Sequence, residues 1–313
     1  MKQEKIITKI KTKIILKSSF LFSDEKYLKL LFKSYMGYKL NLKYPRTFSE
    51  KLQWLKLYNR NPLYTIMVDK VKVKEYVANK IGRQYIIPTL GVWDNVYKID
   101  FNQLPNQFVI KCNHNSGKGM FICKDKSKIN INKIRKELNK GLKQDYYSLF
   151  REWPYKNVPR RILAEQYLES NDNLSNENEN KASLIGNLRD YKLYCFNGEP
   201  KLCQIISDRA VDEKIDFYDM NWNRIPNLVG LTANTHNSNN EIPCPKSFND
   251  MYKNACILSQ EIPFSRIDFY DINGKAYFGE ITFFPASGLG SFYPQKWNDI
   301  IGEWITLPSK TIE

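Results

Sequence analysis

Histidine and closely spaced cysteines are scarce in this chain of 313 residues. Only two histidines occur, His114 and His236, and none of the six cysteines belongs to a Cys-x-x-Cys pair. Structural zinc sites are built from such clusters, so we do not expect one. Several cysteines lie inside apolar, strand-like runs, which is typical of buried free thiols in a reducing compartment. A cytoplasmic protein is therefore expected.

The chain also lacks an apolar stretch long enough to cross a bilayer. Its first 22 residues intersperse lysines among isoleucines, and these lysines interrupt any signal-peptide core, so export is not expected. Two interpretations of this segment stay open. It forms either a helix packed on the body of the protein or a basic amphipathic helix in peripheral contact with the inner face of a membrane.

Acidic residues are outnumbered, with 33 against 48 basic residues and a formal net charge of +15. This excess indicates an anionic partner, such as a nucleotide, an anionic glycan, an acidic membrane or a nucleic acid. The lysines are spread along most of the chain, and no nucleic-acid-binding module is recognisable, so we expect no nucleic-acid partner. A hydrophobic content of 42% is typical of a folded globular protein.

The most informative segment, residues 264–288, is predicted to form two strands around a tight turn. Its residues alternate between two sets that should face opposite sides of the sheet. The apolar set is Ile267, Phe269, Ile281 and Phe283, and the polar set is Arg266, Asp268, Glu280 and Thr282.

The turn decides whether the two acids meet. A two-residue Asn273-Gly274 turn would place Asp268 opposite Gly279 and send Glu280 to the other face. A three-residue turn over 272–274 would pair 268 with 278 and 266 with 280, with both acids on one face. Burial of the apolar set favours the three-residue turn, which we predict. Two carboxylates and a hydroxyl on one face are suitable ligands for Mg²⁺, whereas an ordinary hairpin with solvated charges is the alternative.

The remaining pattern predicts an α+β fold, because antiparallel hairpins are interspersed with helices. Expected helices span 48–58, 65–81, 131–149 and 247–262, and expected strands span 108–112, 120–123, 161–168, 190–196 and 200–207.

Residues 113–119 form a polar, glycine-containing loop between two of these strands. Such a loop can hold phosphate through its backbone N–H groups, although it lacks the Walker spacing and could be a plain hairpin tip. Lys111, inside the preceding apolar strand, requires a counter-charge.

The order of these pieces resembles the ATP-grasp superfamily, in which two α+β lobes with antiparallel sheets hold ATP between them. Three local segments, 48–55, 151–155 and 190–200, resemble the TupA-like ATP-grasp proteins of bacterial surface-polysaccharide clusters. The resemblance runs from about residue 45 to the C-terminus. It implies a basic helical extension (1–45), a helical subdomain (46–104), a first lobe with the phosphate loop (105–168), a flexible polar loop (169–188) and a second lobe with the metal site (189–313).

The resemblance also implies roles for individual residues, with ATP and Mg²⁺ as cofactors. Lys70 and Lys111 would contact the α- and β-phosphates, and Ser116, Gly117 and Gly119 would belong to the loop that closes over the triphosphate. Glu165, Tyr167 and Leu168 would bind adenine, and Asp172 would bind ribose. Lys192 would approach the γ-phosphate, and Arg266 would stabilise the acyl-phosphate region. Asp268 and Glu280 would hold Mg²⁺, with Thr282 standing where the superfamily usually has asparagine.

The implied reaction is ATP-dependent ligation of a carboxylate to an amine through an acyl phosphate. Its substrates would be an anionic, uronic-acid-containing glycan or sugar precursor and an amino acid or amine. A phosphotransferase, a non-catalytic nucleotide-binding accessory protein and a glycosyltransferase are the alternatives, and the order of lysines, loop and acids favours ATP over a nucleotide sugar. Candidate substrate-binding residues are Arg151, Trp153, Tyr155, Arg209, Ser287 and Gly288, although Trp153 and Tyr155 could equally be core residues.

Overall fold

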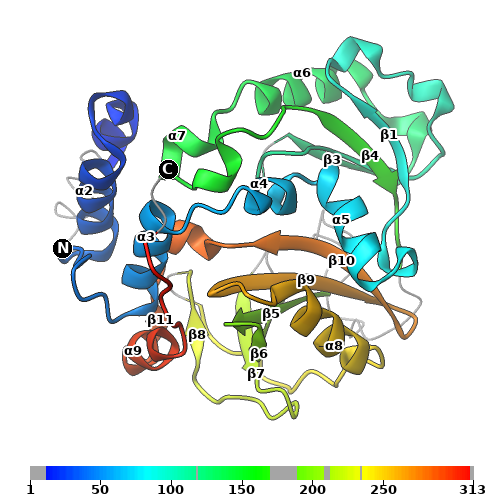
Figure 1. The fold of residues 1–313 in the computed structure, drawn as a ribbon. Coiled ribbons are helices and arrows are strands. Elements are labelled where there is room, and N and C mark those ends of the chain that lie inside the picture. Colours follow the sequence, from blue (N-terminus) through cyan, green and yellow to red (C-terminus); the bar gives the residue numbers. More distant parts are fainter. Residues whose placement is uncertain (1–11, 118, 170–188, 208–211, 233–234, 311–313) are drawn as a thin grey trace.

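The computed structural model describes residues 12–117, 119–169, 189–207, 212–232 and 235–310. It has two lobes, each built on an antiparallel sheet, with a helical region at the N-terminal side (Figure 1). The α+β class predicted from the sequence is therefore confirmed. Among the described residues, every helix is too short or too polar to cross a bilayer.

The first lobe contains a four-stranded sheet in the order β1-β4-β2-β3. Helix α6 packs against it, with Ile134 and Leu138 in the same apolar cluster as Phe108 and Ile110 of β2. The strands are β1 (Thr89–Trp93), β2 (Phe108–Cys112), β3 (Met120–Cys123) and β4 (Ile162–Gln166), and α6 spans Ile131–Leu142.

The second lobe contains a five-stranded sheet in the order β10-β9-β5-β6-β7, with α8 packed against it. Its strands are β5 (Asp190–Phe196), β6 (Glu199–Ser207), β7 (Lys214–Tyr218), β9 (Phe264–Ile272) and β10 (Lys275–Thr282), and α8 spans Phe248–Ser259. A small sheet pairs β8 (Val229–Gly230) with β11 (Phe292–Tyr293), and α9 (Lys296–Glu303) follows.

The remaining helices join the N-terminal region to the two lobes. They are α2 (Asp24–Met36), α3 (Phe48–Tyr58), α4 (Leu63–Val68), α5 (Lys72–Ile81) and α7 (Tyr146–Phe150). Short 3-10 turns lie at η1 (Ser19–Leu21), η2 (Arg83–Tyr85), η3 (Val96–Lys98), η4 (Phe101–Gln103), η5 (Lys126–Lys128), η6 (Trp153–Tyr155) and η7 (Pro285–Gly288). Figure 1 shows α4 and α5 where the two lobes meet.

Two helices expected to be continuous are interrupted. The helix predicted over 65–81 is divided into α4 and α5, because Asp69 has an extended backbone. The helix predicted over 131–149 ends at Leu142, and α7 starts afresh where the Asp145 side chain caps the Ser148 N–H. In both places an aspartate side chain binds local backbone N–H groups, which competes with helix continuation.

The turn between β9 and β10 corrects the predicted register. Asn273 and Gly274, with φ of 54° and 80°, form a two-residue turn in which Lys275 pairs with Ile272. The predicted three-residue turn and its 268–278 and 266–280 pairs are therefore wrong. A β-bulge between Phe278 and Glu280 restores the phase, so Asp268 pairs with Glu280, and Arg266 pairs with Thr282.

The two acids nevertheless share one face, as predicted. The burial pattern of β10 shows where the bulge lies. The buried positions of β10 change phase between Phe278 and Ile281, at Gly279. A Cβ at Gly279 would lie 3.0 Å from the Asp268 carbonyl oxygen.

We predict that Gly279→Val destabilises the protein by about 1–3 kcal/mol, because the new side chain must displace the backbone of β9. Urea unfolding measures the change. Lys275→Val, at an exposed position of the same strand, is the matched control and should change stability by at most about 0.5 kcal/mol. Equal stability of Gly279→Val and the native protein would contradict the bulge.

Candidate functional site

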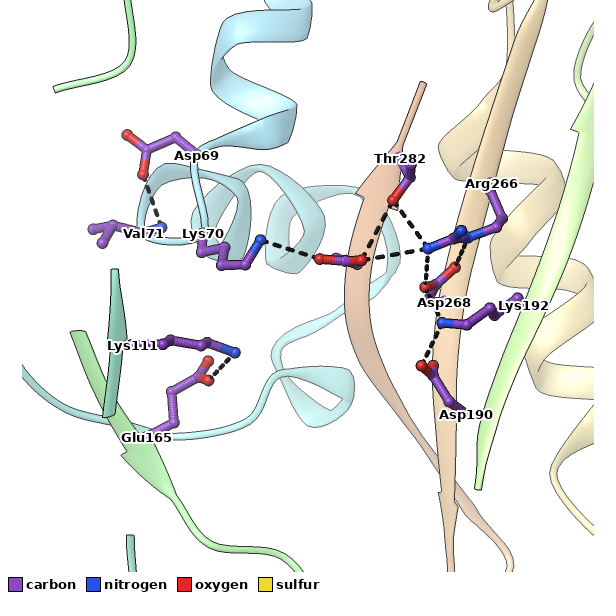
Figure 2. Close-up of polar contacts among 11 residues, drawn as sticks. Asp69, Lys70, Val71, Lys111, Glu165, Asp190, Lys192, Arg266, Asp268 and Thr282 are labelled. Atoms are coloured by element: carbon purple, nitrogen blue, oxygen red, sulfur yellow. Dashed lines mark hydrogen bonds and ion pairs between the residues drawn. The ribbon is translucent and has the colours of Figure 1, made fainter. Parts of the chain in front are cut away.

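Three neighbouring strands place a row of charges on one face of the second sheet. Lys192 of β5 pairs in register with Asp268 of β9, and Asp268 pairs with Glu280 of β10. The Lys192 Nζ lies 2.6 Å from the Asp268 Oδ2 and also contacts Asp190, two residues earlier on β5 (Figure 2). Lys192 and Asp268 are both buried. The register of the sheet alone therefore brings these residues together.

Arg266 and Thr282 form the next row of the same face. The Arg266 guanidinium donates to both Asp268 oxygens, each at 2.7 Å, in a bidentate arrangement. Its Nη2 also donates to the Thr282 hydroxyl at 3.2 Å and lies 3.4 Å from the Glu280 Oε1 (Figure 2). Arg266 thus fixes the orientation of both predicted metal carboxylates.

Lys70 connects this face to the first lobe. Its Nζ lies 3.1 Å from the Glu280 Oε2. The backbone next to it is held by Asp69, a buried carboxylate that accepts from the Asn113 side chain at 2.7 Å and from Arg161 at 2.8 Å. Because the chain breaks between α4 and α5, the Lys70 side chain extends toward Glu280 of the second sheet.

The charge balance keeps Glu280 ionised. Burial raises the pKa of its carboxyl, but Lys70, Arg266 and Lys192 outweigh burial and hold that pKa well below its ordinary value. About a third of the Glu280 side chain remains exposed. An ionised, partly accessible carboxylate is available to a cation.

Glu165 provides the counter-charge that the sequence requires for Lys111. The Lys111 Nζ lies 2.5 Å from one Glu165 oxygen, and the Lys74 Nζ of α5 lies 2.5 Å from the other. Burial raises the pKa of Glu165, but the two lysines reverse the shift and lower it overall. The predicted contact of Glu165 with adenine stays a prediction.

A cleft lies between the lobes beside these pairs. Apolar side chains from both lobes and the charged ends of three lysines form its walls. Its lining residues are Lys70, Val73, Lys74, Ile86, Ile87, Lys111, Glu165, Phe278 and Gly279. Tyr167 and Leu168, just after β4, are half-buried.

The loop 113–119 is anchored at its base and exposed at its tip. Asn115 donates to the Gly141 carbonyl at 2.7 Å. Gly119, with φ of 69°, packs so closely on Gly141 that a Cβ there would lie 3.0 Å from the Gly141 Cα. Ser116 and Gly117 are exposed. The structure thus places Gly119 at the fixed base and leaves Ser116 and Gly117 accessible.

A model of the TupA-like ATP-grasp family matches residues 50–306. The chain belongs to the TupA-like ATP-grasp family. The fold predicted from the sequence is thereby confirmed, and the two lobes with antiparallel sheets are those of an ATP-grasp protein.

Solved structures with a similar arrangement include ATP-grasp ligases. The D-alanine–D-alanine ligase from Bacillus anthracis, complexed with ATP, has 14% identity, covers 70% of this chain and 54% of its own, and gives a TM-score of 0.39. The same enzyme from Helicobacter pylori has 15% identity, with 79% and 60% covered and a TM-score of 0.41. The ligase PsnB with minimal precursor, Mg and ADP has 10% identity, with 75% and 57% covered and a TM-score of 0.37.

This TupA-like ATP-grasp protein therefore spans a little over half the length of the structures it resembles. No curated protein matches it by sequence. The family assignment rests on the family model and not on these distant likenesses.

Glu280 fits Mg²⁺ bound together with a nucleotide. In the described part of the chain, no group of three or more histidine, cysteine or acidic side chains could hold a metal. Mg²⁺ usually takes only one or two protein carboxylates and completes its shell with water and phosphate oxygens. Glu280 supplies an accessible carboxylate, and Asp268, opposite it, is the second, with both of its oxygens bound by Arg266 in this structure. Lys70, at the α4–α5 junction, and Lys111, on the first sheet, line the adjacent cleft.

The candidate substrate residues fall into different environments. Arg151 ties the N-terminal helices to α7, because it lies 2.9 Å from Asp24 and donates to the Ser19 and Ser148 carbonyls. The guanidinium is buried in these contacts, and its predicted use as a fork for a substrate carboxylate stays a prediction. Trp153 is a buried core residue. Asp172 and Arg209 lie outside the described residues.

Ser287 and Gly288 lie in a strained turn directly after β10. Ala286, Ser287 and Gly288 have φ of 48°, 54° and 60° in succession, a conformation that concentrates at functional sites. The Ser287 hydroxyl donates to Glu152 at 2.6 Å, and the Lys56 Nζ donates to the Ser287 carbonyl at 2.7 Å. Burial lowers the pKa of Lys56 to about 8, against the opposing effect of Glu152.

Two tyrosines connect this turn to the rest of the site. Burial raises the pKa of Tyr146, and the Glu152 carboxylate adds to the shift. Tyr155 packs edge-on against Tyr146 at 4.8 Å, and burial followed by Glu152 raises its pKa as well. Tyr146, Tyr155, Ser287 and Glu152 therefore form one corner, which lies at the turn after β10, the strand that carries Glu280. We call it the acceptor corner.

Several residues of this site cannot be identified from the sequence. Lys74 fits an ordinary amphipathic helix pattern and so gives no separate signal. Lys56, Glu152 and Tyr146 come together only in the tertiary fold. Asp190 had a detectable signal, because it lies two residues before Lys192 on a predicted strand and so shares its face.

We predict that Glu165→Gln destabilises the protein by about 3–5 kcal/mol at neutral pH, because two partly buried lysines lose their counter-charge. The lowered pKa of Glu165 contributes stability above the ordinary value of about 4.3, and this contribution is lost as pH falls through the folded value. The gap between variant and native protein should therefore narrow as the solution is acidified. Thermal unfolding across a pH series measures it.

Glu137→Gln is the matched control, since Glu137 forms an exposed pair with Lys140. It should change stability little at any pH. A Glu165→Gln penalty that stays constant down to strongly acidic pH would contradict the assigned ion pairs.

Proposed function

We propose that this protein is an ATP-dependent carboxylate–amine ligase. The observation that carries the proposal is the ion pair from Lys70 to Glu280, which completes a cluster in which Lys70, Lys192 and Arg266 contact Glu280 and Asp268 beside the cleft. Such a cluster suits the transfer of a phosphoryl group, because catalysis of that reaction depends on positioning and charge neutralisation.

The proposed reaction has two steps. A carboxylate oxygen attacks the γ-phosphorus of ATP, ADP leaves, and an acyl phosphate forms. The nitrogen of an amine then attacks the acyl carbon, phosphate leaves, and the nitrogen loses a proton as the amide forms. Mg²⁺, when bound by Asp268 and Glu280, would neutralise phosphate charge.

The residues of the cleft would each perform a defined part. Lys70 and Lys111 bind the non-transferred phosphates. Lys192 and Arg266, on adjacent strands, neutralise the charge on the transferred group. Ser116 and Gly117, at the exposed loop tip, cover it from solvent.

The proposed substrates are a uronic-acid-containing capsular or cell-envelope glycan, or its precursor, and an amino acid or amine. The resemblance to proteins of surface-polysaccharide clusters and the net charge of +15 support an anionic substrate. The acceptor corner is the site we assign to it, because it follows β10, the strand that carries Glu280, and contains hydroxyls and aromatic rings.

We predict that the protein, given ATP and Mg²⁺, releases phosphate only when a uronic acid and an amine are both present. Coupled phosphate release and mass spectrometry of the product measure this. Glu280→Gln should lower the rate by about a hundredfold or more, because it removes one of the two carboxylates proposed to hold Mg²⁺. Glu75→Gln, which breaks only an exposed pair with Arg83, is the control and should retain the rate.

Other outcomes identify the alternatives. Phosphate retained on a hydroxyl of the acceptor identifies a phosphotransferase. Tight ATP binding without turnover, and without an effect of Glu280→Gln, identifies a nucleotide-binding accessory protein.

We predict that Ser287→Ala raises the KM for the uronic acid by about tenfold, because one hydrogen bond at the acceptor corner is lost. The KM for ATP should stay nearly unchanged. Steady-state kinetics with each substrate varied in turn separates the two. Ser127→Ala, an exposed serine of the first lobe, is the control. An equal increase of both KM values would contradict the location of the acceptor.

A further inference from the structure

The N-terminal helices present an unusual surface on the side of the molecule away from β1 and α5 (Figure 1). Residues 12–17 form a helix, η1 forms a turn, and α2 returns alongside. Ile15, Leu16 and Phe22 pack inward on the cluster that contains Tyr27 and Leu28. This helical hairpin is therefore docked on the protein by one face and has a second face free of that cluster.

Large apolar side chains occupy the free face at the tip of the hairpin. Phe20 is 80% exposed, Leu21 is 67% exposed, and Ile14 is 60% exposed. Single exposed apolar residues are common, but Phe20 and Leu21 are adjacent on η1 and Ile14 lies on the helix just before it, so together they indicate an interaction surface.

Lysines are frequent in the same segment. Residues 12–44 contain seven lysines and only two carboxylates. Asp24 pairs inward with Arg60 and Arg151, and Glu25 pairs with Lys29 at the surface, so most of the lysines are not offset by an acid of this segment. Lys26, Lys29 and Lys33 are all exposed and recur at helical spacing on the side of α2 opposite its buried residues.

We propose that the segment 12–44 docks on the surface of an anionic phospholipid bilayer. The lysines attract the headgroups, and Phe20 and Leu21 insert at the boundary between headgroups and acyl chains. Nucleic acid, the other polyanion, would use the lysines but leave the exposed aliphatic and aromatic tip without a partner, since a duplex binds such surfaces through its phosphates. The combination of charge and apolar tip therefore favours lipid.

This surface is separate from the cleft between the lobes, because none of the cleft-lining residues belongs to the segment 12–44. Docking therefore leaves the proposed active site open, and its test does not depend on the ligase activity.

Cosedimentation of the full chain with vesicles tests the proposal. We expect binding to vesicles of equal parts phosphatidylcholine and phosphatidylglycerol, weakening as salt is raised to about 0.15 M or more, and little binding to phosphatidylcholine alone. Phe20→Ser with Leu21→Ser should lower the affinity for anionic vesicles by about tenfold or more. Lys26→Gln with Lys33→Gln should lower it by a similar factor.

Matched variants elsewhere on the surface provide the controls. Leu90→Ser with Tyr97→Ser removes two exposed apolar residues, and Lys128→Gln with Lys140→Gln removes two exposed lysines, each away from the hairpin. Both should bind vesicles like the native protein, and circular dichroism checks that every variant is folded. Absence of binding to anionic vesicles, equal binding to neutral vesicles, or unchanged binding of both hairpin variants would overturn the proposal. Displacement of the vesicles by a DNA duplex, which the tip variant still binds, would overturn it in favour of nucleic acid.

Discussion

The ion pair between Lys70 and Glu280 is the interaction on which the site of this ATP-grasp protein depends, because it ties β10 of the second lobe to the α4–α5 junction, where the neighbouring Asp69 binds Asn113 and Arg161 of the first lobe. It belongs to a set of opposite charges that are held close together out of bulk water. Lys192 and Arg266 both contact Asp268, while Lys74 and Lys111 both contact Glu165. Lys70, Lys192 and Arg266 are matched by three carboxylates, those of Asp190, Asp268 and Glu280. Lys74 and Lys111 share the single carboxylate of Glu165, so the excess positive charge of these groups lies there, where it favours an anionic ligand.

Strand register positions the charged residues on the polar face of the second sheet. Adjacent strands align Lys192, Asp268 and Glu280, so each side chain emerges beside its partner. The bulge at Gly279 makes this alignment compatible with the tight two-residue turn. One extra residue without a side chain thus allows apolar residues to stay buried on both sides of the bulge while Glu280 faces the cleft.

Buried polar contacts also fix the backbone of the first lobe and of the acceptor corner. Asp69 joins the start of α5 to Asn113 at the base of the loop and to Arg161. Lys56 and Glu152 hold the strained turn at Ser287. Buried polar groups are costly unless they are satisfied, so these contacts specify one arrangement of the backbone next to the cleft. The loop tip at Ser116 and Gly117 remains exposed between these two fixed supports.

The sequence by itself determined what depends on local periodicity and order. It predicted the helix 48–58, most of the strands, the family, and the shared face of Asp268 and Glu280. It also showed that Lys111 needs a counter-charge. Only the tertiary structure decided the two-residue turn with its bulge, because that choice depends on which side chains the whole sheet can bury. The same holds for the partners of Lys74, Arg151 and Glu152, since they come from segments far apart in the chain. Residue patterns report local geometry, whereas such contacts exist only after the lobes have packed.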